Sequence, residues 1–182
     1  LAERDARNTA TLADDPWPAA DASPWSAPPP APPTTGRFDP EDGRFSFETG
    51  LARPTPRPWV NVLANPEFGA LVSESGAGCT WAGNSRLHQL SAWGNDPLAD
   101  MDGESFHLQD LRTAQTWTLG HAGAGAMQRC RVEHGPGSSR IEQILENGDG
   151  RACVEVATTW CVASSSAIKR VRIALRNIGP RD

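Results

Sequence analysis

Short runs in which apolar and polar residues alternate with a period of two dominate the chain after residue 44. Phe45 and Phe47 alternate with polar neighbours, and Val171, Ile173 and Leu175 alternate with arginines or a small residue. A period of two places every second side chain on one face, which is typical of half-buried antiparallel strands. Comparable β-rich runs cover residues 59–63, 68–72, 106–109, 129–133 and 154–160. The sequence therefore predicts an all-β protein.

Turn signals separate these runs. Four of them combine Gly with Asp, Asn or Pro: Asp42-Gly43, Asp102-Gly103, Gly135-Pro136-Gly137 and Asn147-Gly148-Asp149-Gly150. Many short strands joined by such turns predict an antiparallel β-sandwich. Gly76-Ala77-Gly78 is interpreted as another tight turn, because a nucleotide-binding loop needs a third Gly and a following helix.

A proline-rich segment precedes the β-rich region. Residues 16–33 hold eight of the sixteen prolines, and proline favours extended structure because it fixes φ and lacks an N–H. We predict a linker or extended arm over residues 1–36 and a sandwich domain over residues 37–182. A ligand for an SH3 or WW domain is the alternative for the proline run.

The net charge and the cysteine content limit which partners and bound groups are expected. The net charge of −5 argues against a nucleic-acid partner, which would favour a basic stripe. Cys79, Cys130, Cys153 and Cys161 form no C-x-x-C motif, so free and mostly buried thiols are expected. Two disulfides or a zinc site are the alternatives. No metal and no cofactor is predicted, and no apolar run approaches the ~20 residues that a membrane-spanning helix needs.

The segment from Trp81 to Asp96 is the candidate binding site. Indole faces stack on sugar rings, while amides and a guanidinium suit hydroxyl groups that both donate and accept hydrogen bonds. The candidate residues are Trp81, Asn84, Arg86, Trp93, Asn95 and Asp96. The alternative, which the residues alone leave open, is that the tryptophans belong to the core and the polar groups brace the loop.

An acidic stretch follows this segment. It contains Asp96, Asp100, Asp102, Glu104 and Asp110, whose spacing does not match an EF-hand loop. We interpret it as an exposed acidic loop, with a calcium site or a glycosidase carboxylate pair as the alternatives.

Trp59 lies in a continuous apolar run with Val60, Val62 and Leu63. The run predicts a core residue and not a sugar platform, because a buried strand needs its large apolar side chains inside.

Several of these motifs resemble one known family. They include Thr55-Pro56-Arg57-Pro58-Trp59-Val60-Asn61, Gly76-Ala77-Gly78, Thr80-Trp81-Ala82-Gly83-Asn84-Ser85-Arg86, Trp93-Gly94-Asn95-Asp96-Pro97 and Val132-Glu133-His134-Gly135-Pro136-Gly137. Over about Arg37 to Asp182 the chain is similar to the N-terminal supersandwich domain of glycoside hydrolase family 94. The phosphorylase-like module of cyclic β-1,2-glucan synthases is the nearest variety, with cellobiose, cellodextrin and chitobiose phosphorylases as further relatives.

The resemblance implies a partial supersandwich, galactose-mutarotase-like in fold, cut from a larger enzyme. In that family an (α/α)-barrel carries the catalytic Asp, so no catalytic residue is expected in this chain. The implied partners are a β-glucan or oligosaccharide, the barrel of the same polypeptide, and a second copy in a homodimer. The implied location is the cytoplasmic face, within a membrane-associated protein. A self-standing carbohydrate-binding module and a purely structural interaction domain are the alternative functions.

Overall fold

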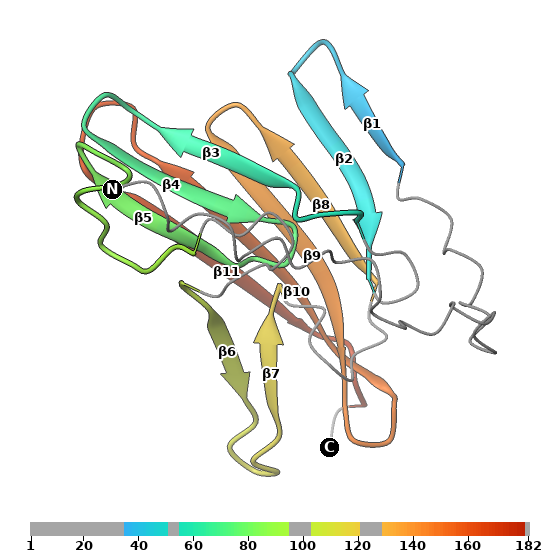
Figure 1. The fold of residues 1–182 in the computed structure, drawn as a ribbon. Coiled ribbons are helices and arrows are strands. Elements are labelled where there is room, and N and C mark those ends of the chain that lie inside the picture. Colours follow the sequence, from blue (N-terminus) through green and yellow to red (C-terminus); the bar gives the residue numbers. More distant parts are fainter. Residues whose placement is uncertain (1–34, 51–54, 95–102, 121–128, 181–182) are drawn as a thin grey trace, which may run out of the picture. The chain divides into compact units, whose positions relative to one another are not determined.

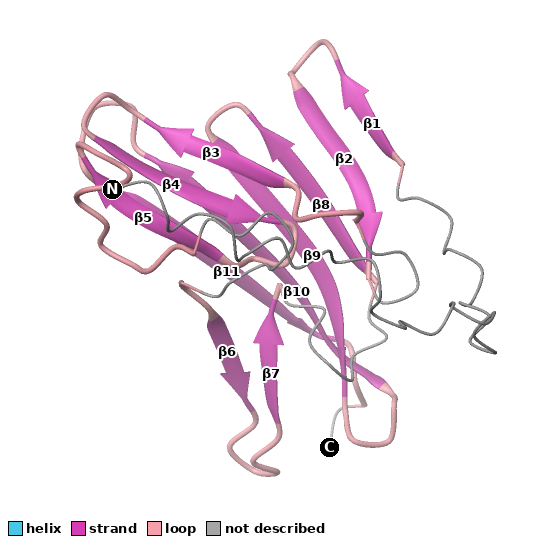
Figure 2. Ribbon diagram, viewed as in Figure 1, coloured by secondary structure: helices cyan, strands magenta, loops and turns pink. Residues whose placement is uncertain are grey.

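The structure is a computed structural model that describes residues 35–50, 55–94, 103–120 and 129–180. Leu1–Pro30 and Ala31–Asp182 are separate units, and the first lies outside the described residues. The proline-rich arm therefore stays a prediction. Every regular element in the described part is a strand, and every pairing is antiparallel, so the all-β fold is confirmed (Figure 2).

The larger sheet has the strand order β1-β2-β8-β9-β10-β11 (Figure 1). Because β2 pairs directly with β8, the chain between them forms an excursion that leaves this sheet and returns to it. The strands are β1 (Gly36–Asp39), β2 (Arg44–Thr49), β8 (Cys130–Gly135), β9 (Ser138–Glu146), β10 (Ala152–Val162) and β11 (Lys169–Asn177).

The excursion builds a three-stranded sheet and a hairpin. The sheet contains β3 (Val60–Ala64), β4 (Phe68–Ser73) and β5 (Gly78–Ala82), and the hairpin contains β6 (Phe106–Gln109) and β7 (Thr116–Leu119). Asn65, in the turn between β3 and β4, fastens this layer to the other sheet. Its Nδ2 donates to the carbonyl oxygens of Ala163 and Ser166 at 2.7 and 2.9 Å, in the β10–β11 turn.

The two sheets share a hydrophobic core. Leu63 and Val72 from the three-stranded sheet pack with Val132, Ile141 and Trp160 of the larger sheet, and each of the five is at most 1% exposed. A second cluster joins β7 to β9 and β10 through Leu119, Leu145 and Val156. Two β-layers packed over one core are the sandwich that the alternating runs predicted.

The prediction that β11 is half-buried is wrong for most of its length. Ile173 and Leu175 are 39% and 51% exposed. Their register partners on β10, Thr158 and Val156, are fully buried on the same face. The inner face of the larger sheet is thus covered over β10 and at Val171, but the described residues leave it open along β11 from Ile173 onward.

Four strands were not expected from the sequence: β1, β5, β7 and β9. In β9 the inward residues include Ser139 and Gln143, while Ile144 points outward, so the apolar period is masked. All four cysteines are free thiols, as predicted. None of the described residues forms a helix long and apolar enough to cross a membrane.

Candidate functional site

Trp81 lies at the end of β5, on the outer face of the three-stranded sheet, and not in a loop as the sequence suggested. It pairs in register with Gly69 of β4. An ideal Cβ at position 69 would lie 2.3 Å from the indole Cζ2 atom, so the indole occupies the space above this glycine. Part of the ring is therefore used for packing, and the Trp81 side chain is half-buried.

Asn84 shapes the loop that follows β5. Its Oδ1 accepts hydrogen bonds from the backbone N–H groups of Arg86 and Leu87, both at 2.9 Å. This is an Asx turn, in which the side chain replaces a backbone partner. The amide oxygen of Asn84 is thus committed to the loop, as in the bracing alternative.

The loop returns along β5. The Ala82 N–H donates to the His88 carbonyl oxygen at 3.1 Å, and the Leu90 N–H donates to the Thr80 carbonyl oxygen at 2.8 Å. Gln89 forms an isolated β-bridge with Trp81. Residues 83–90 therefore behave as a hairpin loop that is fixed to the edge of the three-stranded sheet.

Two further candidates lie on the surface of this region. Trp93 is 38% exposed, and Arg86 is exposed with no ion-pair partner among the described residues. Asn95 and Asp96 lie outside the described residues. The structure thus brings Trp81, Asn84 and Arg86 together on β5 and its loop, while sugar binding by them stays a prediction.

A polar cluster, here called the clasp, joins this region to β11. It consists of Thr80, Ser91, Glu104 and Lys169. Glu104 Oε1 accepts hydrogen bonds from Thr80 Oγ1 and from Ser91 Oγ, the second at 2.7 Å, and its Oε2 forms an ion pair with Lys169. Lys169 Nζ also donates to Thr80 Oγ1 at 3.2 Å. No spacing in the sequence signals these contacts.

The clasp holds Glu104 as a carboxylate. Burial by itself raises the pKa of this carboxyl, but the Lys169 ammonium and the hydroxyls of Thr80 and Ser91 outweigh it and lower the pKa. The prediction of an exposed acidic loop is therefore wrong at Glu104. Asp96, Asp100 and Asp102 lie outside the described residues, and no group of three His, Cys, Asp or Glu side chains with metal-binding geometry occurs in the described part.

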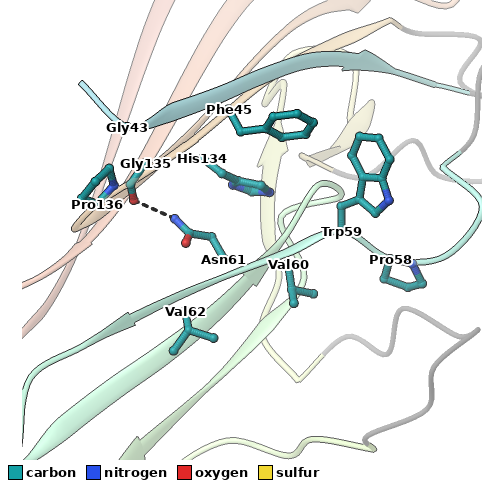
Figure 3. A pocket seen from close by; sticks show the side chains of 10 residues that line it. All are labelled: Gly43, Phe45, Pro58, Trp59, Val60, Asn61, Val62, His134, Gly135 and Pro136. Carbon is teal, nitrogen blue, oxygen red and sulfur yellow. Dashed lines mark hydrogen bonds between the residues drawn. The ribbon is translucent and has the colours of Figure 1, made fainter. Parts of the chain in front are cut away.

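A groove of about 500 Å³ opens beside Trp59, between the β8–β9 turn and β3 (Figure 3). Trp59 is half-buried and packs on Phe45 and Phe47, with ring centroids 5.5 and 4.8 Å apart. It contacts the core as predicted, but it also lines this groove. The other lining residues are Gly43, Phe45, Pro58, Val60, Asn61, Val62, His134, Gly135 and Pro136.

An Asn–Ser–His network begins at the groove wall, with Asn61 partly buried and Ser139 and His134 buried. Asn61 Nδ2 donates to Ser139 Oγ at 3.0 Å, and Ser139 Oγ lies 3.1 Å from His134 Nδ1. Burial lowers the pKa of His134, and a weaker effect of the Trp59 carbonyl opposes this shift. Ser139 is fully buried, so a substrate cannot reach its hydroxyl. The network fixes β3 to the β8–β9 turn and is not a nucleophile with its base.

Comparisons with known proteins found a matching family model and a curated relative. It matches the family model described as "Glycosyl hydrolase 94, supersandwich domain" over residues 45–182. It is 31% identical, over 140 residues, to "Cyclic beta-(1,2)-glucan synthase NdvB" of Rhizobium meliloti (strain 1021). That match covers 75% of this chain and 5% of the relative, so the chain spans about 5% of the length of the curated relative it matches.

Proposed function

Because the chain belongs to the glycosyl hydrolase 94 supersandwich family, as the resemblance predicted, we propose that it is an accessory domain of a glucan-processing enzyme. In this proposal the domain supports a catalytic barrel and shapes the cleft that holds the glucan. It does not itself carry out the chemistry.

The open inner face of β11 is the observation that carries the proposal. A sandwich buries the inner faces of both sheets, yet Ile173 and Leu175 remain 39% and 51% exposed. Further structure that packs along this edge would cover them, as expected of a domain that supports a larger enzyme. A second copy of the chain in a homodimer is the other occupant that the proposal allows.

The name of the relative suggests the ligand. A cyclic β-1,2-glucan synthase handles β-1,2-linked glucose, so we propose a β-1,2-glucan as the polymer that this domain contacts. We propose that the contact involves Trp81, Arg86 and Trp93, because the exposed Trp93 indole can stack on a sugar ring and the Arg86 guanidinium can donate hydrogen bonds to its hydroxyl groups. The proposal includes a place in a membrane-associated protein, on its cytoplasmic face.

A purely structural role is the second candidate, and one observation favours it. The Asn84 carboxamide oxygen is occupied by the Asx turn and is not available to a sugar hydroxyl. In that case the loop only braces the neighbouring catalytic part, and glucan contact is made elsewhere.

An activity assay tests the accessory role. General acid catalysis needs a positioned carboxylic acid beside the scissile oxygen. We therefore expect the 182-residue chain, incubated with β-1,2-glucan and inorganic phosphate, to release no glucose 1-phosphate above a buffer control. Release that scales with protein concentration and survives repurification would contradict the proposal.

A further inference from the structure

The clasp connects segments that are distant in sequence. Thr80 belongs to β5, Ser91 ends the return of the loop, Glu104 precedes β6, and Lys169 begins β11. It therefore joins the edge strand of the three-stranded sheet to the edge strand of the larger sheet. Each of the four side chains forms a hydrogen bond or an ion pair with at least one of the other three.

The clasp is shielded from water. The side chains of Lys169 and Glu104 are 11% and 25% exposed. An ion pair in such surroundings is screened little by salt, and removal of one partner leaves the other without compensation. The ion pair between Arg176 and Glu155 is different, because these side chains are 72% and 41% exposed on the outer face of the sheet.

Ser91 connects the clasp to the end of the hairpin loop. Its Oγ accepts the Thr80 N–H at 2.8 Å and donates to Glu104 at 2.7 Å. The neighbouring Leu90 N–H donates to the Thr80 carbonyl oxygen at 2.8 Å. The carboxylate therefore orients the hydroxyl that holds the returning end of the loop against β5.

The backbone beside the clasp leaves little free space. A Cβ at Gly103 would lie 1.9 Å from the Ala92 carbonyl oxygen and 2.6 Å from the Gly78 carbonyl oxygen. Residues 92 and 103 are thus pressed together against the start of β5. This contact is independent of the clasp hydrogen bonds and brings Glu104 close to Ser91.

We propose that Glu104 and Lys169 are positioning residues. They hold the end of the hairpin loop (residues 83–90) and the residues that follow it on β5, and so set the place of Trp93. Neither side chain needs to touch a ligand in this role. The proposal depends on the proposed function only for its consequence, which is that loss of the clasp weakens glucan contact at this loop.

Amide hydrogen exchange on the full chain tests the proposal without any sugar. In Glu104→Ala, the Leu90 amide should exchange on the order of tenfold faster, because the hydrogen bonds that hold this end are lost. Amides of β10 should change by less than a factor of about two. Glu104→Gln, which keeps an acceptor but not the charge, should give a smaller increase at Leu90.

Matched variants separate positioning from general stability. Lys169→Met should reproduce the increase at Leu90, and Lys169→Arg should restore protection, because it keeps a cation at the same place. Glu155→Ala, which removes the exposed ion pair with Arg176, should leave the Leu90 amide unchanged. If Glu104→Ala fails to fold, Glu104→Gln and Lys169→Met decide the question by the same readout.

Two results would overturn the proposal: an unchanged Leu90 amide in the clasp variants, or an equal rise in the β10 amides. The second result would show that the clasp contributes only to global stability. A glucan titration that shows no binding would count against the proposed function alone, because the exchange measurement does not depend on a ligand.

Discussion

β10 and β11 are neighbours in one sheet, and they carry the same alternating pattern, yet they differ in burial. Val156 and Trp160 on β10 are at most 1% exposed, whereas Leu175, the register partner of Val156, is half exposed. β3 and β4 of the three-stranded sheet lie near β10. The alternating pattern therefore determines which face of the sheet a side chain occupies, while the second layer determines whether that face is buried.

The difference has an energetic meaning. Apolar surface removed from water contributes roughly 25 cal/mol per Å², so covered residues stabilise the fold and open ones contribute little. β11 is covered only near its start, where Lys169 joins the clasp and Val171 packs against the core. Substitutions at the covered centre, at the clasp end and along the open edge should therefore have separable effects.

The largest effect is expected at the covered centre. Trp160→Ala should lower the free energy of unfolding by about 3–5 kcal/mol, because it empties a large, fully buried site in contact with Phe106. Urea unfolding measures this loss. A loss below about 1 kcal/mol would show that the centre of β10 is not covered in solution.

The next effect is expected beside the clasp. Gly103→Ala should cost about 1–3 kcal/mol, because the added methyl group meets the carbonyl oxygens of Ala92 and Gly78. Gly148→Ala is the control, since a Cβ there meets nothing within 4 Å. Equal unfolding free energies for the two variants would contradict the close approach of residues 92 and 103.

The clasp also predicts a dependence of stability on pH. Because the pKa of Glu104 is lowered in the folded state, its contribution is present above the pKa of an unfolded Glu, about 4.3. The contribution is lost as the pH falls through the lower, folded pKa. The difference in unfolding free energy between the wild type and Glu104→Gln should therefore shrink between about pH 5 and pH 3. A difference that stays constant over this range would contradict a charged, ion-paired Glu104.

The smallest effect is expected on the open edge. Leu175→Ala should lower the free energy of unfolding by less than about 1 kcal/mol, because half of the side chain is already in water. A loss of 2 kcal/mol or more in urea unfolding would show that something covers β11 in solution, such as a second copy of the chain. Concentration dependence of the unfolding midpoint would identify that case.

Much of the fold could be predicted because most strands show their alternating pattern within a few neighbouring residues. Phe45 and Phe47 in β2, or Val156 and Trp160 in β10, alternate clearly with outward residues. β9 was missed because Ser139 and Gln143 take inward positions, where hydrogen bonds satisfy them instead of apolar contacts. The exposure of Leu175 could not be predicted, since it depends on what the rest of the fold places above β11.

The candidate site was predicted less completely. Trp81, Arg86 and Asn84 were selected from residue type and from family resemblance. The roles that Gly69 and the Asx turn give to Trp81 and Asn84 come from pairings between strands. The clasp joins Thr80 to Lys169 across the sandwich, and no local pattern in the sequence marks such a pair.

A titration of labelled protein with a β-1,2-gluco-oligosaccharide tests whether this domain contacts glucan at the loop after β5. Stacking of one sugar ring gains little beyond the cost of association, so we expect about millimolar affinity, followed by NMR shifts. We expect shifts at Trp81, Arg86 and Trp93 in the unmodified chain, and Trp93→Ala should abolish them. Leu111→Ala, which removes a side chain that is 92% exposed on the hairpin tip, should leave them intact. No shifts, or shifts elsewhere that persist in both Trp81→Ala and Trp93→Ala, would contradict glucan contact at this loop.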